Sequence, residues 1–289
     1  MHNNYLQKTF SWKRIIADRL ATLGAILAAL LVLTPLVAIL VYLVIRGASA
    51  LNWDFLTHAP KPVGETGGGM GNAIIGSALI LGISSLIGIP LGIGAGIYLS
   101  EYGHGRLSTL VRFIADVLNG VPSIVMGIAV YALVVVPQRH FSALAGGVAL
   151  GIMMIPTITR ATEEMLLMVP RSIREAALAL GVAEWRSVIL VTLRTALPGV
   201  ITGIMLAFAR VAGETAPLLF TAFGNQFWNL KLNQPTAALP LQIYTYAISP
   251  FDEWHRQAWA GALVLIAIIM GTVLVVRLIA ARGVMKGSA

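Results

Sequence analysis

The chain has 289 residues, of which 57% are hydrophobic and only 11% are charged, and its mean hydropathy is +0.84. A soluble globular protein carries about 25% charged residues, so this composition indicates an integral membrane protein. The sequence contains no cysteine, which excludes disulfides, thiolate metal sites and cysteine nucleophiles. We expect no metal ion and no cofactor. The net charge of +8 fits the basic cytoplasmic loops of a membrane protein, and no basic run or motif indicates nucleic-acid binding.

Six apolar segments predict an all-α membrane protein with six transmembrane helices. A polar, basic N-terminus precedes the first segment, which at about 25 residues is too long for the apolar core of a signal peptide. The second segment is rich in glycine, which predicts close contacts between helices in the lipid. The segments cover about 20–45, 72–99, 109–136, 141–163, 196–221 and 256–280.

The distribution of basic residues predicts the orientation. If the N-terminus is cytoplasmic, 14 of the 20 Lys and Arg residues fall in cytoplasmic segments and 5 in outer segments, while Arg210 stands alone inside a span. Basic residues accumulate on the cytoplasmic side of membrane proteins. Both termini are therefore predicted to lie in the cytoplasm, which requires an even number of spans.

A charged, alanine-rich stretch at 160–194 separates the fourth and fifth apolar segments. Within it, Glu175, Ala176 and Ala177 precede Gly181, a pattern that resembles the EAA loop of the permeases of ATP-binding-cassette (ABC) importers. The resemblance implies a short coupling helix near 171–190 that docks on a cytoplasmic ATPase. Small side chains let a partner backbone approach closely, and glycine permits a sharp turn. The alternative is an ordinary alanine-rich helix.

Further segments resemble one branch of these permeases, the phosphate-specific one, from about residue 67 to the C-terminus. The segments are GG at 68–69, NGVPS at 119–123, IPTITRATEE at 155–164, ARVAGETAPLLF at 209–220, NQFW at 225–228 and SPF at 249–251. The resemblance implies a type I (MetI-like) permease core at 72–282, preceded by a first helix and outer loop within 1–71 and followed by a cytoplasmic tail at 283–289.

The same resemblance implies partners and a location. It implies a heterodimer with a sister permease, two ATPase subunits and an extracytoplasmic phosphate-binding protein, all at the bacterial cytoplasmic (inner) membrane. The chain contains no G-x-x-x-x-G-K-[ST] phosphate loop, so ATP hydrolysis is expected in the partner and not in this subunit.

Charged residues inside apolar segments are the candidates for a path that carries an anion. Arg210 and Glu214 are spaced i, i+4 in the fifth segment and can pair on one helix face. An arginine at the centre of a span costs about 2.5–3.5 kcal/mol on insertion scales, so it should face protein or water, and its planar fork matches phosphate oxygens. Arg160 is the second candidate. The alternatives are a structural Arg210–Glu214 pair and, for Arg160, a side chain that snorkels to the cytoplasmic surface or follows the positive-inside rule.

Four other polar residues receive structural interpretations. Asp116 and Asn119 are expected to form hydrogen bonds between helices, and Glu163 and Glu164 are expected to be loop or interface charges. Three further functions remain as alternatives: a permease for sulfate or molybdate, a stand-alone secondary transporter and an intramembrane hydrolase. No inverted repeat supports the secondary transporter. The five histidines lie in loops or at span ends, which argues against the hydrolase.

Overall fold

The computed structural model describes residues 12–62, 65, 67–103 and 105–286. Residues 1–11 of the predicted cytoplasmic N-terminal segment and residues 287–289 of the predicted C-terminal tail lie outside these residues. Every regular element in the described part of the chain is a helix, and the only strand-like feature there is an isolated bridge between Phe223 and Thr236. The predicted all-α class is confirmed.

Five helices of the described chain are long and apolar enough to cross a membrane. A sixth span exists if two helices that meet at 107° are counted as one. The six-span prediction therefore holds only if this bent pair crosses the membrane as a unit. The five are α1 (Trp12–Ala48), α3 (Gly71–Ile97) with the π-helical turn η1 (Tyr98–Tyr102), α7 (Ala143–Leu167), α10 (Leu193–Ala212) with the turns before it, and α13 (Asp252–Lys286).

The bent pair occupies the segment predicted at 109–136 as the third span. The first half is α4 (Arg106–Gly120), and the second half comprises α5 (Ser123–Val130), the π-helical turn η2 (Tyr131–Val135) and α6 (Val136–Gln138). Val121 and Pro122 between the halves are extended, with ψ angles of 130° and 137°. Proline has no N–H and disfavours the helical conformation of the residue before it, which explains why the helix ends here.

Helices α3 and α7 pack closely along glycines, as the second apolar segment predicted. A Cβ atom on Gly88 would lie 2.7 Å from the Cβ of Met154, and one on Gly92 would lie 2.6 Å from the Cβ of Ile158. Only glycine fits at these positions of α3, and its missing side chain lets the backbone of α3 pack directly against α7. Gly94, on another face of α3, has no neighbour within 4 Å of such an atom.

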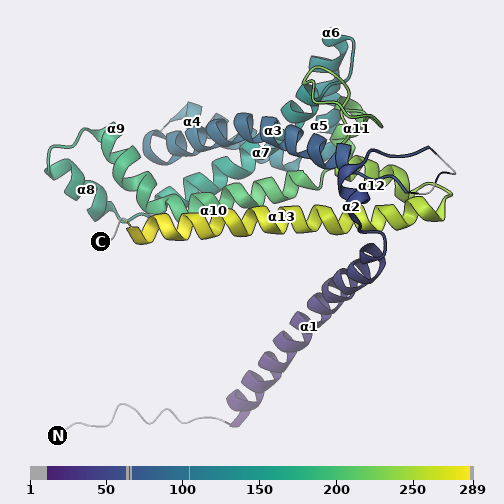
Figure 1. Ribbon diagram of the computed structural model, residues 1–289. Helices are drawn as coiled ribbons and strands as arrows, with labels where there is room; N and C mark the ends of the chain where they lie inside the picture. Colours follow the sequence, from purple (N-terminus) through teal and green to yellow (C-terminus); the bar gives the residue numbers. More distant parts are fainter. Residues whose placement is uncertain (1–11, 63–64, 66, 104, 287–289) are drawn as a thin grey trace, which may run out of the picture.

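The short helices lie at the two ends of this helical body (Figure 1). One end carries α8 (Arg171–Ala179) and α9 (Glu184–Ser187), and we call it the α8 end. Helices α6, α2 (Trp53–Thr57) and α12 (Leu239–Ala247) lie toward the other end. Helix α1 leaves the body at a steep angle (Figure 1), and near its C-terminal end it contacts α13, where the Tyr42 and Trp259 rings meet edge to face at 5.1 Å.

Candidate functional site

An ion-pair network joins α4 to α7. Helix α4 is amphipathic: Arg112, Asp116 and Asn119 recur at helical spacing and contact α7 and the η1 turn, whereas Phe113 and Val117 on another face are exposed. Asn119 accepts a 3.4 Å hydrogen bond from the hydroxyl of Thr157 on α7. The predicted hydrogen bonds of Asp116 and Asn119 between helices are confirmed.

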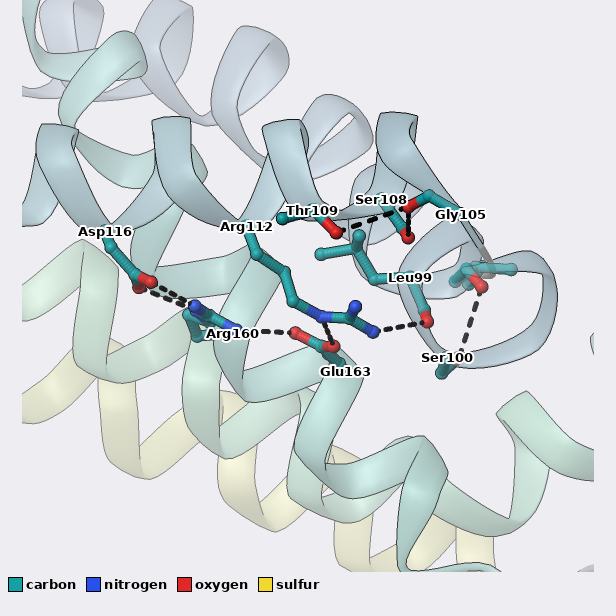
Figure 2. Close-up of polar contacts among 10 residues, drawn as sticks. Leu99, Ser100, Gly105, Ser108, Thr109, Arg112, Asp116, Arg160 and Glu163 are labelled. Atoms are coloured by element: carbon teal, nitrogen blue, oxygen red, sulfur yellow. Dashed lines mark hydrogen bonds and ion pairs between the residues drawn. The ribbon is translucent and has the colours of Figure 1, made fainter.

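Arg160 of α7 lies at the centre of the network (Figure 2). Its Nε donates to Oδ1 of Asp116 at 3.0 Å and its Nη2 donates to Oδ2 at 2.5 Å. The two side chains therefore form a bidentate pair with two parallel hydrogen bonds. Its Nη1 donates to Oε2 of Glu163, one turn along α7, at 3.0 Å. Arg160 is thus neutralised by two carboxylates rather than projecting freely toward the cytoplasm.

Glu163 is buried, with 5% of its side chain exposed, and it links two guanidinium groups. Its Oε1 accepts from Nε of Arg112 at 2.7 Å, and Nη2 of Arg112 donates to the carbonyl of Leu99 in η1 at 3.1 Å (Figure 2). A buried carboxylate is stable only when it is paired and hydrogen-bonded. Glu163 was predicted to be a loop or interface charge; it lies inside α7, not in a loop, at the contact with α4, and its pairing with Arg112 was not predicted.

The predicted pair between Arg210 and Glu214 does not form. Helix α10 ends at Ala212, Gly213 caps it, and a new short helix, α11 (Ala216–Thr221), begins after Thr215. Glu214 is therefore outside the helix that carries Arg210, and in the described part of the chain neither side chain has a hydrogen-bond or ion-pair partner. Pro217 explains the break, because it cannot donate a helical hydrogen bond to residue 213 and is favoured in the first turn of a helix.

The two arginines lie at different depths. Helices α7 and α10 run antiparallel, and Gly203 of α10 lies directly against Ala161 of α7. Arg160 is therefore level with about residue 204, six residues before Arg210, which corresponds to about 9 Å along the helix axis. Arg210 is the farther of the two from the α8 end.

The segment near 171–190 that was predicted as the coupling helix contains α8, the turn after it and α9. Gly181 adopts a φ of +77°, which confirms the sharp turn expected there, and the helix ends before it at Ala179. Glu175 and Ala176 are exposed, whereas Ala177 is buried against its own chain. Ala177 is therefore occupied within this subunit, and the exposed part of the motif consists of Glu175, Ala176 and Gly181.

A second ion pair fastens α8 to the body, and sequence reasoning missed it. Arg174 donates through Nη1 and Nη2 to the two carboxylate oxygens of Glu101 in η1, at 3.0 and 2.9 Å, and also through Nη2 to the carbonyl of Leu166 at 2.6 Å. The Glu101 side chain is only 8% exposed. Its position at the end of an apolar segment was a usable signal, because an acidic residue at such a position needs a partner.

The arrangement of helices is that of a known class of membrane subunit. A solved structure of the MetNI methionine ABC transporter, described as inward facing, superimposes with a TM-score of 0.56 at 19% identity and covers 75% of this chain and 96% of the matched one. That similarity establishes the fold, so the predicted MetI-like core is confirmed. The chain belongs to the family of binding-protein-dependent transport system inner membrane components, whose family model matches residues 88–283.

Two relatives are similar over most of their length. The phosphate transport system permease protein PstA of Yersinia pestis is 44% identical over 277 residues, which cover 96% of this chain and 94% of the relative. The protein of the same name from Haemophilus influenzae is 46% identical over 233 residues, which cover 80% and 82% of the two chains. The chain is thus a multi-pass membrane protein of a transport family.

Proposed function

We propose that this chain is a permease subunit of an ABC importer that carries inorganic phosphate into the cell. The observation that carries the proposal is its 44% identity, over 96% of its length, to a permease named for phosphate transport. The positions of its arginines support the same substrate. Arg160 and Arg210 each place a guanidinium group on a membrane-spanning helix, at different depths. A planar guanidinium fork recognises two oxygens of a phosphate.

The proposed assembly contains this chain, a sister permease, two ATPase subunits and an extracytoplasmic phosphate-binding protein in the cytoplasmic membrane. Lipid surrounds the remaining apolar surface. The dependence on a binding protein follows from the family description. Both termini and the α8 end are proposed to face the cytoplasm, which is consistent with the excess of Lys and Arg on that side.

The proposed anion path contains Arg210, Glu214 and Arg160. Arg210 is exposed on the isolated subunit and has no partner within the described residues. A guanidinium in a span is costly in lipid, so its exposed side should face the sister permease or a water-filled path. Glu214, just beyond the same helix, would limit how tightly the anion is held there.

The proposed ATPase contact consists of Glu175, Ala176 and Gly181, with Ala177 seating the helix on its own subunit. Gly181→Asp and Gly181→Asn form a matched pair, because both side chains tolerate a positive φ and only one adds charge. If an ATPase closely covers this turn, Gly181→Asp should lower phosphate-stimulated ATP hydrolysis of the reconstituted complex far more than Gly181→Asn. Equal activity of the two variants would contradict close docking at this position.

The function is tested with the complete importer in proteoliposomes. ATP-dependent uptake of labelled inorganic phosphate is measured with the binding protein present, and excess unlabelled phosphate, sulfate or molybdate is added in turn as competitor; uptake of labelled sulfate and molybdate is measured in parallel. We expect uptake that requires ATP and the binding protein and that only unlabelled phosphate suppresses. Uptake of sulfate or molybdate in place of phosphate would assign another oxyanion to the permease. Uptake by this chain alone, without ATPase, would indicate a secondary transporter.

A further inference from the structure

The two carboxylates that share Arg160 are held very unequally. Glu163 is 5% exposed and is also bonded to Arg112, so it is fixed from two sides. Asp116 is 60% exposed, and Arg160 is its only side-chain partner within the described residues. Where water reaches it in the proposed anion path, such an exposed ion pair contributes little net stability, because water can replace the partner. Asp116 is therefore the partner that can leave Arg160 at the smaller cost.

Asp116 also occupies the face of Arg160 that an oxyanion would need. It accepts from Nε and Nη2, which lie on one edge of the guanidinium, while Nη1 is taken by Glu163 (Figure 2). Carboxylate and phosphate both accept two parallel N–H bonds from such an edge. A phosphate at Arg160 would therefore take the place of the Asp116 carboxylate.

We propose that Asp116 is an internal competitor for the transported anion: its carboxylate holds Arg160 when no phosphate is present and is displaced when phosphate arrives. This inference rests on the proposed function of the permease. With Asp116 in place, two carboxylates balance the two guanidinium groups of Arg112 and Arg160. A passing anion must compete for the fork, so it binds weakly and leaves easily, which transport through a pore requires.

The displacement leaves the helices joined. Arg112 remains paired with Glu163, and Asn119 remains hydrogen-bonded to Thr157, so α4 keeps two contacts with α7 when Asp116 moves. Asp116 thus tunes the affinity of a site without being needed for its assembly. Its role is to set how tightly the anion is held at Arg160.

The test uses the complete importer in lipid nanodiscs, without binding protein, and inorganic phosphate as the probe. In Asp116→Asn, the side chain is nearly isosteric but the competing charge is gone. We expect the Kd for phosphate to fall about tenfold, because the site gains one net positive charge. In proteoliposomes with binding protein, we expect maximal uptake to fall as release slows. Asp116→Glu, which keeps the charge, should retain a Kd close to that of the native importer.

The matched control is Glu164→Gln, which removes an exposed carboxylate next to Glu163 that has no side-chain partner in the described chain. It should leave both measurements unchanged. An unchanged or higher Kd in Asp116→Asn, or its failure to assemble while Glu164→Gln assembles, would overturn the proposal and make Asp116 a structural contact. A native importer that transports no phosphate would instead overturn the proposed function.

Discussion

Two arginines on neighbouring spans have opposite surroundings. Arg160 is 29% exposed and engages two carboxylates, whereas Arg210 is exposed and has no polar side-chain partner within the described residues. About 9 Å along the helix axis separates them. The same residue type therefore joins two helices at one position and presents an exposed guanidinium at the other.

The α8 end offers a third arginine for the comparison. Arg174 is paired with the buried Glu101 and with a backbone carbonyl, so it resembles Arg160 in its partners. Its pair is the more enclosed of the two, because Glu101 is 8% exposed and Asp116 is 60% exposed. The three positions thus form a series from an enclosed pair at Arg174, through the more exposed pair at Arg160, to Arg210, which has no partner in the described part of the chain.

The largest effect is expected at Arg210, the last position of this series. Arg210→Gln should lower phosphate uptake about 1,000-fold, equivalent to about 4 kcal/mol in the barrier, if its guanidinium guides the anion. Arg210→Lys should also transport poorly, since a point charge does not reproduce the planar fork. Membrane abundance should stay close to that of the native chain, because no partner is lost. Uptake per assembled complex is the quantity to measure.

Two further variants check this assignment. Arg210→Gln combined with Glu214→Gln should transport as poorly as the single variant, because the two side chains are not paired. Recovery of uptake in the double variant would restore the interpretation of a structural pair. Arg160→Gln provides the contrast: it should lower abundance as well as uptake, since the buried Glu163 loses one of its two partners.

The next effect is on stability at the enclosed pair. Arg174→Gln should destabilise the subunit by about 3 kcal/mol, the lower end for a broken buried pair, because Arg174 itself is 22% exposed. Arg171→Gln on the same helix is the control, since Arg171 is exposed and has no side-chain partner within the described residues. The measurement is the thermal midpoint of the purified subunit. Equal thermal midpoints for the two variants would mean that the ion pair between Arg174 and Glu101 does not stabilise the subunit.

The smallest effect is expected at the contact between α3 and α7, on the helix that carries Arg160. Gly92→Ala would place a methyl group 2.6 Å from the Cβ of Ile158, two residues before Arg160, and should cost about 1–3 kcal/mol through overpacking. Gly94→Ala meets nothing within 4 Å and should be neutral or slightly stabilising. The measurement is the thermal midpoint of each purified variant. A tolerated Gly92→Ala would mean that α3 and α7 separate easily and that the network does not depend on their contact.

Much of this protein could be predicted from its sequence, because the relevant physics is local. Long apolar segments specify membrane helices through the cost of exposing peptide groups to lipid. The glycines at 88 and 92 predict a close helix contact, and Gly181 predicts a turn, because the contact and the turn each require a residue without a side chain. The breaks at Pro122 and Pro217 carried a local signal as well, because proline disfavours the helical conformation of the residue before it.

The partners of the charges could be decided only by the tertiary structure. Asp116 and Arg160 are 44 residues apart in the chain, and Glu101 and Arg174 are 73 apart, so only the packing of α4 and η1 against α7 and α8 brings them together. The sequence indicated that charges inside spans need partners, because an unpaired charge in lipid is costly. Which charge meets which depends on helix rotation and depth. These follow from the fit of many side chains at once, and for that reason Arg160 is paired while Arg210 has no side-chain partner among the residues that the structure describes.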